Sequence, residues 1–157
     1  MSPDESKAKR AVLREFSALL RPLGFRPCRT SYFVRMAGDY VEFIHLHKFT
    51  FTLAFRVHCG VRALDDATTH AVLNGPDSDS VATRFPNPLT PRRRYTFSFD
   101  TSEESSHRCA ESMFDFCRRI GEPWFSKRRN KHTVVGRRAS KETVDLFRLS
   151  CDEQTIA

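Results

Sequence analysis

The sequence predicts a single α+β domain, an antiparallel sheet of about four strands with helices packed mainly on one face. Three patterns lead to this fold class. Apolar residues recur at helical spacing near the N-terminus and again around residue 113, and strict alternation marks a strand over residues 51–61. With 157 residues, 39% of them hydrophobic, the chain can bury one core, which we place in residues 1–150, followed by a frayed tail at 151–157.

A first helix is predicted from Ser2 to about Arg21. Residues 2–5 (Ser-Pro-Asp-Glu) form a capping-box pattern with proline at the first helical position. Pro22 and Gly24 end the helix, because proline cannot continue the hydrogen-bond ladder and glycine accepts a left-handed turn. The apolar residues that follow the cap at spacings of three and four are Val12, Leu13, Phe16, Leu19, Leu20 and Leu23.

Three consecutive antiparallel strands are predicted next. Residues 30–36 and 40–48 are rich in β-branched and aromatic side chains, and an Ala-Gly-Asp turn joins them in a hairpin. From residue 51 to 61 apolar and mostly polar residues alternate. A two-residue turn at 49–50 would pair Ile44 with Phe55 and so define the buried face, to which Phe51 also belongs.

The opposite face of these strands carries a mixture of side chains that either a helix covers or a groove exposes. His45 and His47 lie on it roughly 6.8 Å apart along one strand, a spacing that suits two ligands of one metal. In the expected register His58 faces Val41, roughly 13 Å from His45, so no third ligand is available. We therefore expect a partly buried histidine pair with no metal and no cofactor. The groove candidates are His45, His47, Arg56 and His58.

The second half of the chain begins with a short helix predicted at 65–73. A loop from Gly75 to Arg93 follows, with four prolines, and its length indicates either a binding loop or a mobile one. Residues 94–100 alternate as a fourth strand. A second capping box at 101–104 starts a helix with a stripe of apolar residues, which ends at Gly121 before Pro123. The remaining predicted helix spans residues 140–150, with Val144, Phe147 and Cys151 on its inner face.

No catalytic motif is recognisable, so we expect a chain without enzymatic activity. It lacks a Gly-rich phosphate loop, a His-Glu-x-x-His motif and a Gly-x-Ser-x-Gly motif. The five cysteines are odd in number and include no Cys-x-x-Cys pair, which predicts reduced thiols in the cytoplasm. No apolar stretch is long enough to cross a bilayer, so no membrane association is expected.

Several short segments carry a resemblance to a known family. Residues 19–26 (Leu-Leu-Arg-Pro-Leu-Gly-Phe-Arg), residues 32–35 (Tyr-Phe-Val-Arg) and the strands up to residues 59–61 resemble a bacterial family catalogued as domain of unknown function 4304. Trp124, just after the helix at 101–121, is similar to its C-terminal half. The resemblance covers residues 9–61 well and 100–130 loosely. It implies a helix on an antiparallel sheet and supplies no catalytic residues.

The chain departs from this family at the end of the second strand, where His-Lys-Phe at 47–49 replaces a polar ending. Some small bacterial domains of this general kind serve as immunity partners of toxins, which is a likeness of fold alone.

Excess positive charge is concentrated near the C-terminus. The formal net charge is +7, and seven of the 26 Lys and Arg residues lie between residues 123 and 141, where there is no Asp or Glu. The other 19 basic residues balance the 19 acidic ones. The candidate contact residues here are Trp124, Lys127, Arg128, Arg129, Lys131, Arg137 and Arg138.

Several interpretations of these features stay open. The leading one is a non-enzymatic protein-binding domain, of the toxin-immunity type, that meets an acidic protein through the basic segment 127–141 and the loop 75–93. The alternative is a nucleic-acid-binding module, because an indole beside Lys and Arg can stack a base and hold phosphates. A third is an enzyme of unrecognised type that uses His45 and His47. The simplest interpretation is structural: Trp124 covers the end of the preceding helix, and the Lys and Arg side chains of the basic segment are only solvated.

Overall fold

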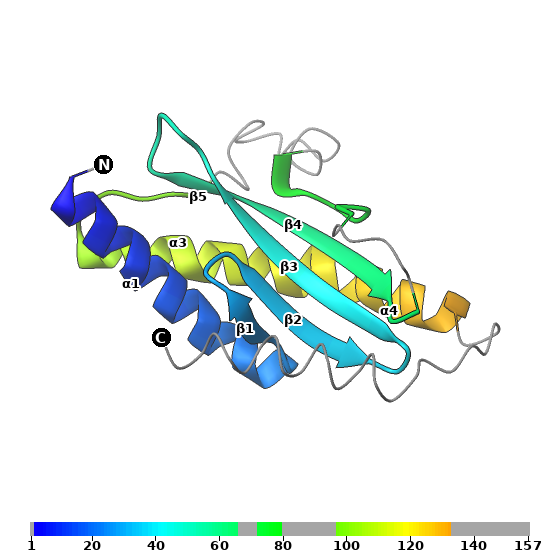
Figure 1. The fold of residues 1–157 in the computed structure, drawn as a ribbon. Helices are drawn as coiled ribbons and strands as arrows, with labels where there is room; N and C mark the ends of the chain where they lie inside the picture. Colours follow the sequence, from blue (N-terminus) through cyan, green and yellow to red (C-terminus); the bar gives the residue numbers. More distant parts are fainter. Residues whose placement is uncertain (1, 66–71, 80–96, 133–157) are drawn as a thin grey trace, which may run out of the picture.

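A five-stranded antiparallel sheet in the order β1-β2-β3-β4-β5 forms one layer of the structure, and long helices cover one of its faces (Figure 1). The computed structural model describes residues 2–65, 72–79 and 97–132. The α+β class and the packing of helices on one face are confirmed. The strands are β1 (Arg26–Arg29), β2 (Tyr32–Ala37), β3 (Tyr40–Lys48), β4 (Ala54–Ala63) and β5 (Phe97–Ser98).

The N-terminal helix α1 (Pro3–Leu20) confirms the predicted capping box. The backbone N–H of Glu5 donates to the Ser2 hydroxyl at 3.2 Å, and the backbone N–H of Ser2 donates to the Glu5 carboxylate at 2.6 Å. Val12, Phe16 and Leu20 are buried against the sheet and the second long helix. A 3-10 turn follows, and Gly24 closes it with a φ of +87°, a conformation that favours glycine.

The pairing of β3 with β4 corrects the predicted register. Ile44 faces Cys59 and Leu46 faces Val57, four residues farther along β4 than the two-residue turn requires. The connection between the strands is longer, since β4 begins only at Ala54, and Phe51 is 98% exposed rather than buried. Because four is an even number, each side chain of β4 keeps its predicted face. The partner of each residue on the neighbouring strand is different, and this changes the cross-strand neighbours of His45, His47 and His58.

Residues 72–79 lie along the outer edge of β4, in line with β5. The Asn74 side chain acts there as a strand backbone would, since its Oδ1 accepts from the Val61 N–H at 3.0 Å and its Nδ2 donates to the Val61 carbonyl at 2.9 Å. The carbonyl of Pro76 and the hydroxyl of Ser78 accept from two further N–H groups of β4. These contacts protect a sheet edge that would otherwise present unpaired backbone groups.

Two predicted elements are affected by this arrangement. Residues 72 and 73 are not helical, so the described end of the predicted helix 65–73 is wrong, and its residues 66–71 lie outside the described part of the chain. Residues 75–77 of the predicted binding loop lie at the sheet edge, residues 78–79 are helical, and residues 80–93 lie outside the described ranges. β5 confirms the fourth predicted strand at residues 97–98, whereas the described residues 99–100 are not in a strand.

The C-terminal helices form a continuous rod beside α1 (Figure 1). Helix α3 spans Glu103–Phe116, and its N-cap is Ser102 rather than the predicted residue 101. Residues 101–104 are therefore not a capping box. The helix does not end at Gly121. A π-helical turn at Cys117–Gly121 leads directly into α4 (Glu122–His132).

Pro123 explains this geometry. The Glu122 N–H donates to the carbonyl of Cys117, five residues back, so the ladder widens at the π-turn. Pro123 then stands in the first turn of α4, where a missing N–H costs little. Gly121 lets the rod approach the sheet, because a Cβ at this position would lie 3.2 Å from the Cys59 sulfur. The predicted helix at 140–150 lies beyond the described residues.

Candidate functional site

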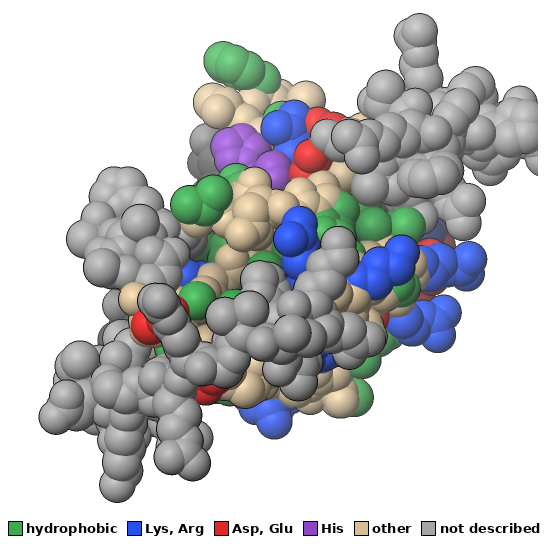
Figure 2. Space-filling model, turned by 90° about the vertical axis from the view of Figure 1, so that its right-hand side faces the viewer, with side chains coloured by type: hydrophobic (Ala, Val, Ile, Leu, Met, Phe, Trp, Pro, Cys, Tyr) green, Lys and Arg blue, Asp and Glu red, His purple; other side chains and the backbone are tan. Residues whose placement is uncertain are grey.

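The predicted basic segment begins as the exposed side of α4. Lys127 is exposed and Arg128 is half-buried, and neither forms an ion pair with any residue that the structure describes. Figure 2, which looks at the end of the molecule where α4 lies in Figure 1, shows Lys and Arg side chains gathered toward the right of its view. Lys131 also belongs to α4, whereas Arg137 and Arg138 are outside the described residues. The segment up to residue 132 is therefore a helix rather than a solvated loop.

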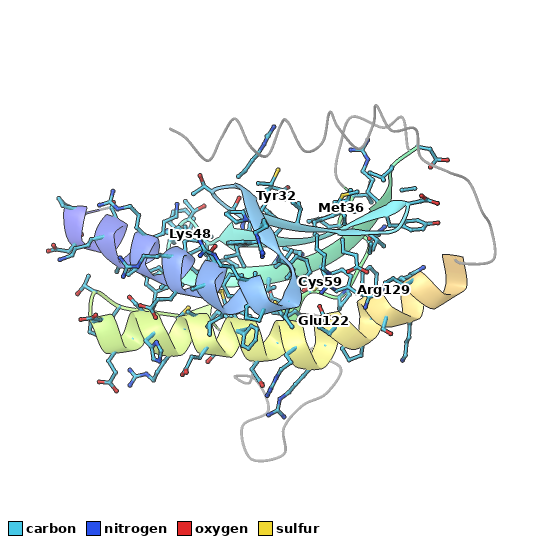
Figure 3. All side chains as sticks on the ribbon, turned by 90° about the horizontal axis from the view of Figure 1, so that it is seen from below. Tyr32, Met36, Lys48, Cys59, Glu122 and Arg129 are labelled. Carbon is cyan, nitrogen blue, oxygen red and sulfur yellow. The ribbon has the colours of Figure 1, made fainter. Side chains whose placement is uncertain are left out.

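Arg129 turns the other way, into the interface between α4 and the sheet. Its Nη1 donates to both oxygens of Glu42, at 2.8 and 2.9 Å, and the Glu42 side chain is completely buried. Figure 3 shows Arg129 and Glu122 beside Cys59 between helix and sheet. Arg129 is thus engaged with the buried carboxylate of Glu42. This corrects the prediction that its guanidinium is available to a binding partner.

Arg35 completes this ion-pair network from the neighbouring strand. It faces Glu42 directly across β2 and β3, and its Nε and Nη2 donate to one Glu42 oxygen at 2.8 and 2.5 Å. The same guanidinium bonds Glu122 of α4 and lies over the Phe25 ring, 4.2 Å from its centroid. Two arginines therefore neutralise a carboxylate that burial alone would make very costly. The network fixes the orientation of α4 on the sheet.

Trp124 is half-buried and packs toward the edge of β4. A Cβ on Gly75 would lie 2.8 Å from the far end of the indole, so only glycine leaves room for the ring there. The Phe125 ring meets the indole edge-on at 5.3 Å, and the Arg128 guanidinium lies over it at 5.3 Å. One face of the indole is therefore already occupied by a cation within the protein.

The face of the sheet away from the helices carries a row of stacked rings from three neighbouring strands. Tyr32 stacks on His45 with centroids 4.3 Å apart, and His45 stacks on His58 at 5.8 Å. His45 and His58 are direct cross-strand partners. The predicted distance of roughly 13 Å between them is wrong, because it followed from the four-residue error in register. In Figure 3 Tyr32 lies on the side of the sheet opposite Glu122.

The imidazoles in this row stay neutral over a wider pH range than usual. Burial lowers the pKa of His45, and the positive charge that His58 and His47 would carry lowers it further. The pKa of His58 is also lowered, mainly by burial, although Asp77 opposes the shift. Neutral imidazoles can coordinate a metal, but the described residues contain no group of three or more suitable ligands.

The remaining groove candidates have partners within the protein. Arg56 faces His47 across the strands, forms an ion pair with Asp79 and lies 5.1 Å from the centroid of the Phe49 ring. Figure 2 shows histidines near the top of its view with basic and acidic side chains beside them. The four groove candidates are thus close together, in a mixed patch of opposite charges.

The three buried cysteines lack the surroundings that a nucleophile needs. Cys59, Cys109 and Cys117 are buried, and Cys28 is half-buried. Burial raises the pKa of the Cys109 thiol to about 12 and raises the pKa of Cys59 and Cys117 as well. A thiol that stays protonated is a poor nucleophile. The fifth cysteine, Cys151, lies outside the described residues.

Sequence reasoning missed Glu42, the centre of the ion-pair network. A signal was present, because Glu42 shares the parity of Ile44 and Leu46 and therefore points toward the core. A carboxylate at such a position requires cationic partners.

Among the described helices, none combines the length and apolar character needed to span a membrane. Comparisons with protein-family models, with curated proteins and with solved structures gave no match to this chain.

Proposed function

We propose that this chain is a non-enzymatic protein-binding domain that contacts an acidic partner through the outer side of α4. One observation carries the proposal: Glu42 anchors Arg129 beneath the helix, while Lys127 and Arg128 project from it without an ionic partner among the described residues. A fixed helix with unpaired cations loses little conformational freedom when it binds. Charge complementarity would then speed association and select the partner.

The geometry favours a protein over single-stranded nucleic acid as the partner. Stacking of a base needs an open aromatic face, and Arg128 lies over the face of Trp124. The indole is also wedged against Gly75 at the sheet edge. A base could stack only after Arg128 had moved away, whereas an acidic side chain could meet Arg128 and Lys127 where they are. Nucleic-acid binding is therefore the alternative that the experiment has to exclude.

Within this proposal the chain belongs to the bacterial family that residues 19–26 and 32–35 resemble and acts in the cytoplasm. Reduced thiols support a reducing compartment, since Cys59, Cys109 and Cys117 are buried thiols outside any disulfide. If the domain is of the immunity type, its partner is a toxin encoded by a neighbouring gene.

The proposal is tested by affinity purification of the whole chain from the organism that produces it, at about 0.15 M salt, with and without nuclease. We expect a stoichiometric acidic protein that survives nuclease treatment and dissociates as salt is raised. Recovery of the chain alone, even at low salt, would contradict the proposal. Recovery of nucleic acid with a steep salt dependence would replace it with the alternative.

A further inference from the structure

A cleft between α1 and β1 carries a second concentration of positive charge, far from α4 in the sequence. Its volume is about 380 Å³ and three arginines line it: Arg10 and Arg14 from α1, and Arg29 from β1. Figure 1 shows β1 directly beside α1. A volume of this size falls at the lower end of the range for small-molecule sites.

The backbone explains why three cations meet here. Arg10 and Arg14 are four residues apart, so they project from the same side of α1. The pairing of β1 with β2 shifts register between Pro27 and Arg29, and an irregularity of this kind changes the direction of the side chain that follows it. Arg29 thereby lines the same cleft as the two helical arginines.

The three guanidinium groups lack anionic partners within the described chain. None of them makes an ion pair or a hydrogen bond with another described side chain. No Asp or Glu of the described residues lines the cleft. Of the acidic residues in α1, Glu15 is engaged with His107 and Glu5 with the helix cap, while Asp4 lines a neighbouring cavity that Arg10 and Arg14 also border. All three side chains are exposed, so water screens their mutual repulsion, and an anion in the cleft would meet three positive charges at once.

We propose that this cleft binds a small phosphate monoester. The dianion would lie among the three arginines, whose planar guanidinium groups can each donate two hydrogen bonds to a phosphate. Leu13 and Phe33 also line the cleft and would contact an apolar part of the ligand, while the Ser17 hydroxyl can donate a further hydrogen bond. The inference is independent of the α4 surface, because no residue of α4 lines the cleft.

The test is an NMR titration of the whole chain with phenyl phosphate, inorganic phosphate and phenol at pH 7.5. Phenyl phosphate is a dianion there and carries a ring that can pack on Leu13. We expect amide shifts in residues 10–17 and 28–30, tighter binding of phenyl phosphate than of inorganic phosphate, and no binding of phenol. Arg14→Gln and Arg29→Gln should each weaken phenyl phosphate binding about tenfold, the loss of one charge-assisted contact.

Arg21→Gln is the matched control, since Arg21 is exposed next to α1 but does not line the cleft. It should leave the affinity unchanged, and so should Lys127→Gln on α4. Equal weakening by Arg21→Gln would reduce the effect to general charge attraction and overturn the proposal. Absence of phenyl phosphate binding at millimolar concentration, or binding only of a phosphate polymer such as RNA, would overturn it as well.

Discussion

Arg129 reaches from α4 to Glu42, a fully buried carboxylate on β3, and donates to both of its oxygens at 2.8 and 2.9 Å. The two residues are 87 positions apart in the chain, so the contact joins the N-terminal sheet to the C-terminal helix. Arg35 occupies the other side of the same carboxylate. Glu42 is therefore the point through which the sheet determines where α4 and its exposed cations lie.

Glu42→Gln should destabilise the protein by about 2 kcal/mol or more. The substitution keeps the side-chain volume but removes the negative charge that compensates Arg35 and Arg129 at a buried site. The partial exposure of Arg129 keeps the expected loss below that for a fully buried pair. Urea denaturation gives the free energy of unfolding, and amide exchange in α4 should become faster.

The matched control for this substitution is Glu104→Gln. Glu104 also pairs with an arginine, Arg108, but both side chains are largely exposed on α3. Its loss should cost at most about 0.5 kcal/mol. Equal effects of the two substitutions would show that the buried network stabilises the protein no more than an exposed ion pair does.

His45 and His58 should titrate separately from His107. Burial lowers the pKa of His45 and His58 below the ordinary 6.5, so both should gain their protons below that pH. A hydrogen bond from Glu15, with Glu111 nearby, raises the pKa of His107. NMR titration of the ring protons checks this order. Titration of His45 above 6.5 would contradict its position in the stacked row.

The same shifts predict how stability depends on pH. As the pH falls below 6.5, His45 and His58 become protonated in the unfolded chain while they are still neutral in the folded protein. The free energy of unfolding therefore falls. His107 acts in the opposite direction, since its stabilising contribution is present below 6.5 and is lost as the pH rises through its raised pKa. His58→Gln should make the acid-side loss of stability smaller. An unchanged pH profile would show that the stacked pair does not control it.

Gly60→Ala should destabilise the protein by about 1–3 kcal/mol. The Phe43 ring lies across Gly60 on the neighbouring strand, so an added Cβ would overlap it. Thermal unfolding measures the loss. The double variant with Phe43→Leu should recover part of it, because the smaller side chain leaves room for the methyl group. Equal destabilisation by Gly60→Ala with and without Phe43→Leu would refute steric overlap as the cause.

Local sequence signals were sufficient for most of the helices and strands. The capping box at Ser2 and the left-handed Gly24 fix the two ends of the first helical segment. Each of these signals involves only residues that are close to one another in the sequence. Alternation placed Val57 and Cys59 on the buried face. The fold class followed from these elements because the amphipathic helix and the one-sided strands must cover each other.

The parts that could not be predicted depend on contacts between distant residues. The register of β4 depends on a connection whose length has no clear turn signature, and the neighbour of His45 depends on that register. The continuation of α3 through Pro123 depends on a π-turn that Gly121 permits beside Cys59. Residues 74–78 resemble a loop in composition, yet one Asn side chain and one Pro carbonyl let them complete the sheet edge.

The most direct test of the central claim compares partner recovery by three forms of the chain under identical conditions. The wild type is compared with Lys127→Gln/Arg128→Gln and with Arg118→Gln/Arg119→Gln, which removes two exposed cations from the same rod that already pair with Asp115. We predict that the first double variant loses most of the bound protein and that the second retains it. Equal recovery by all three forms would contradict the assignment of α4 as the contact surface.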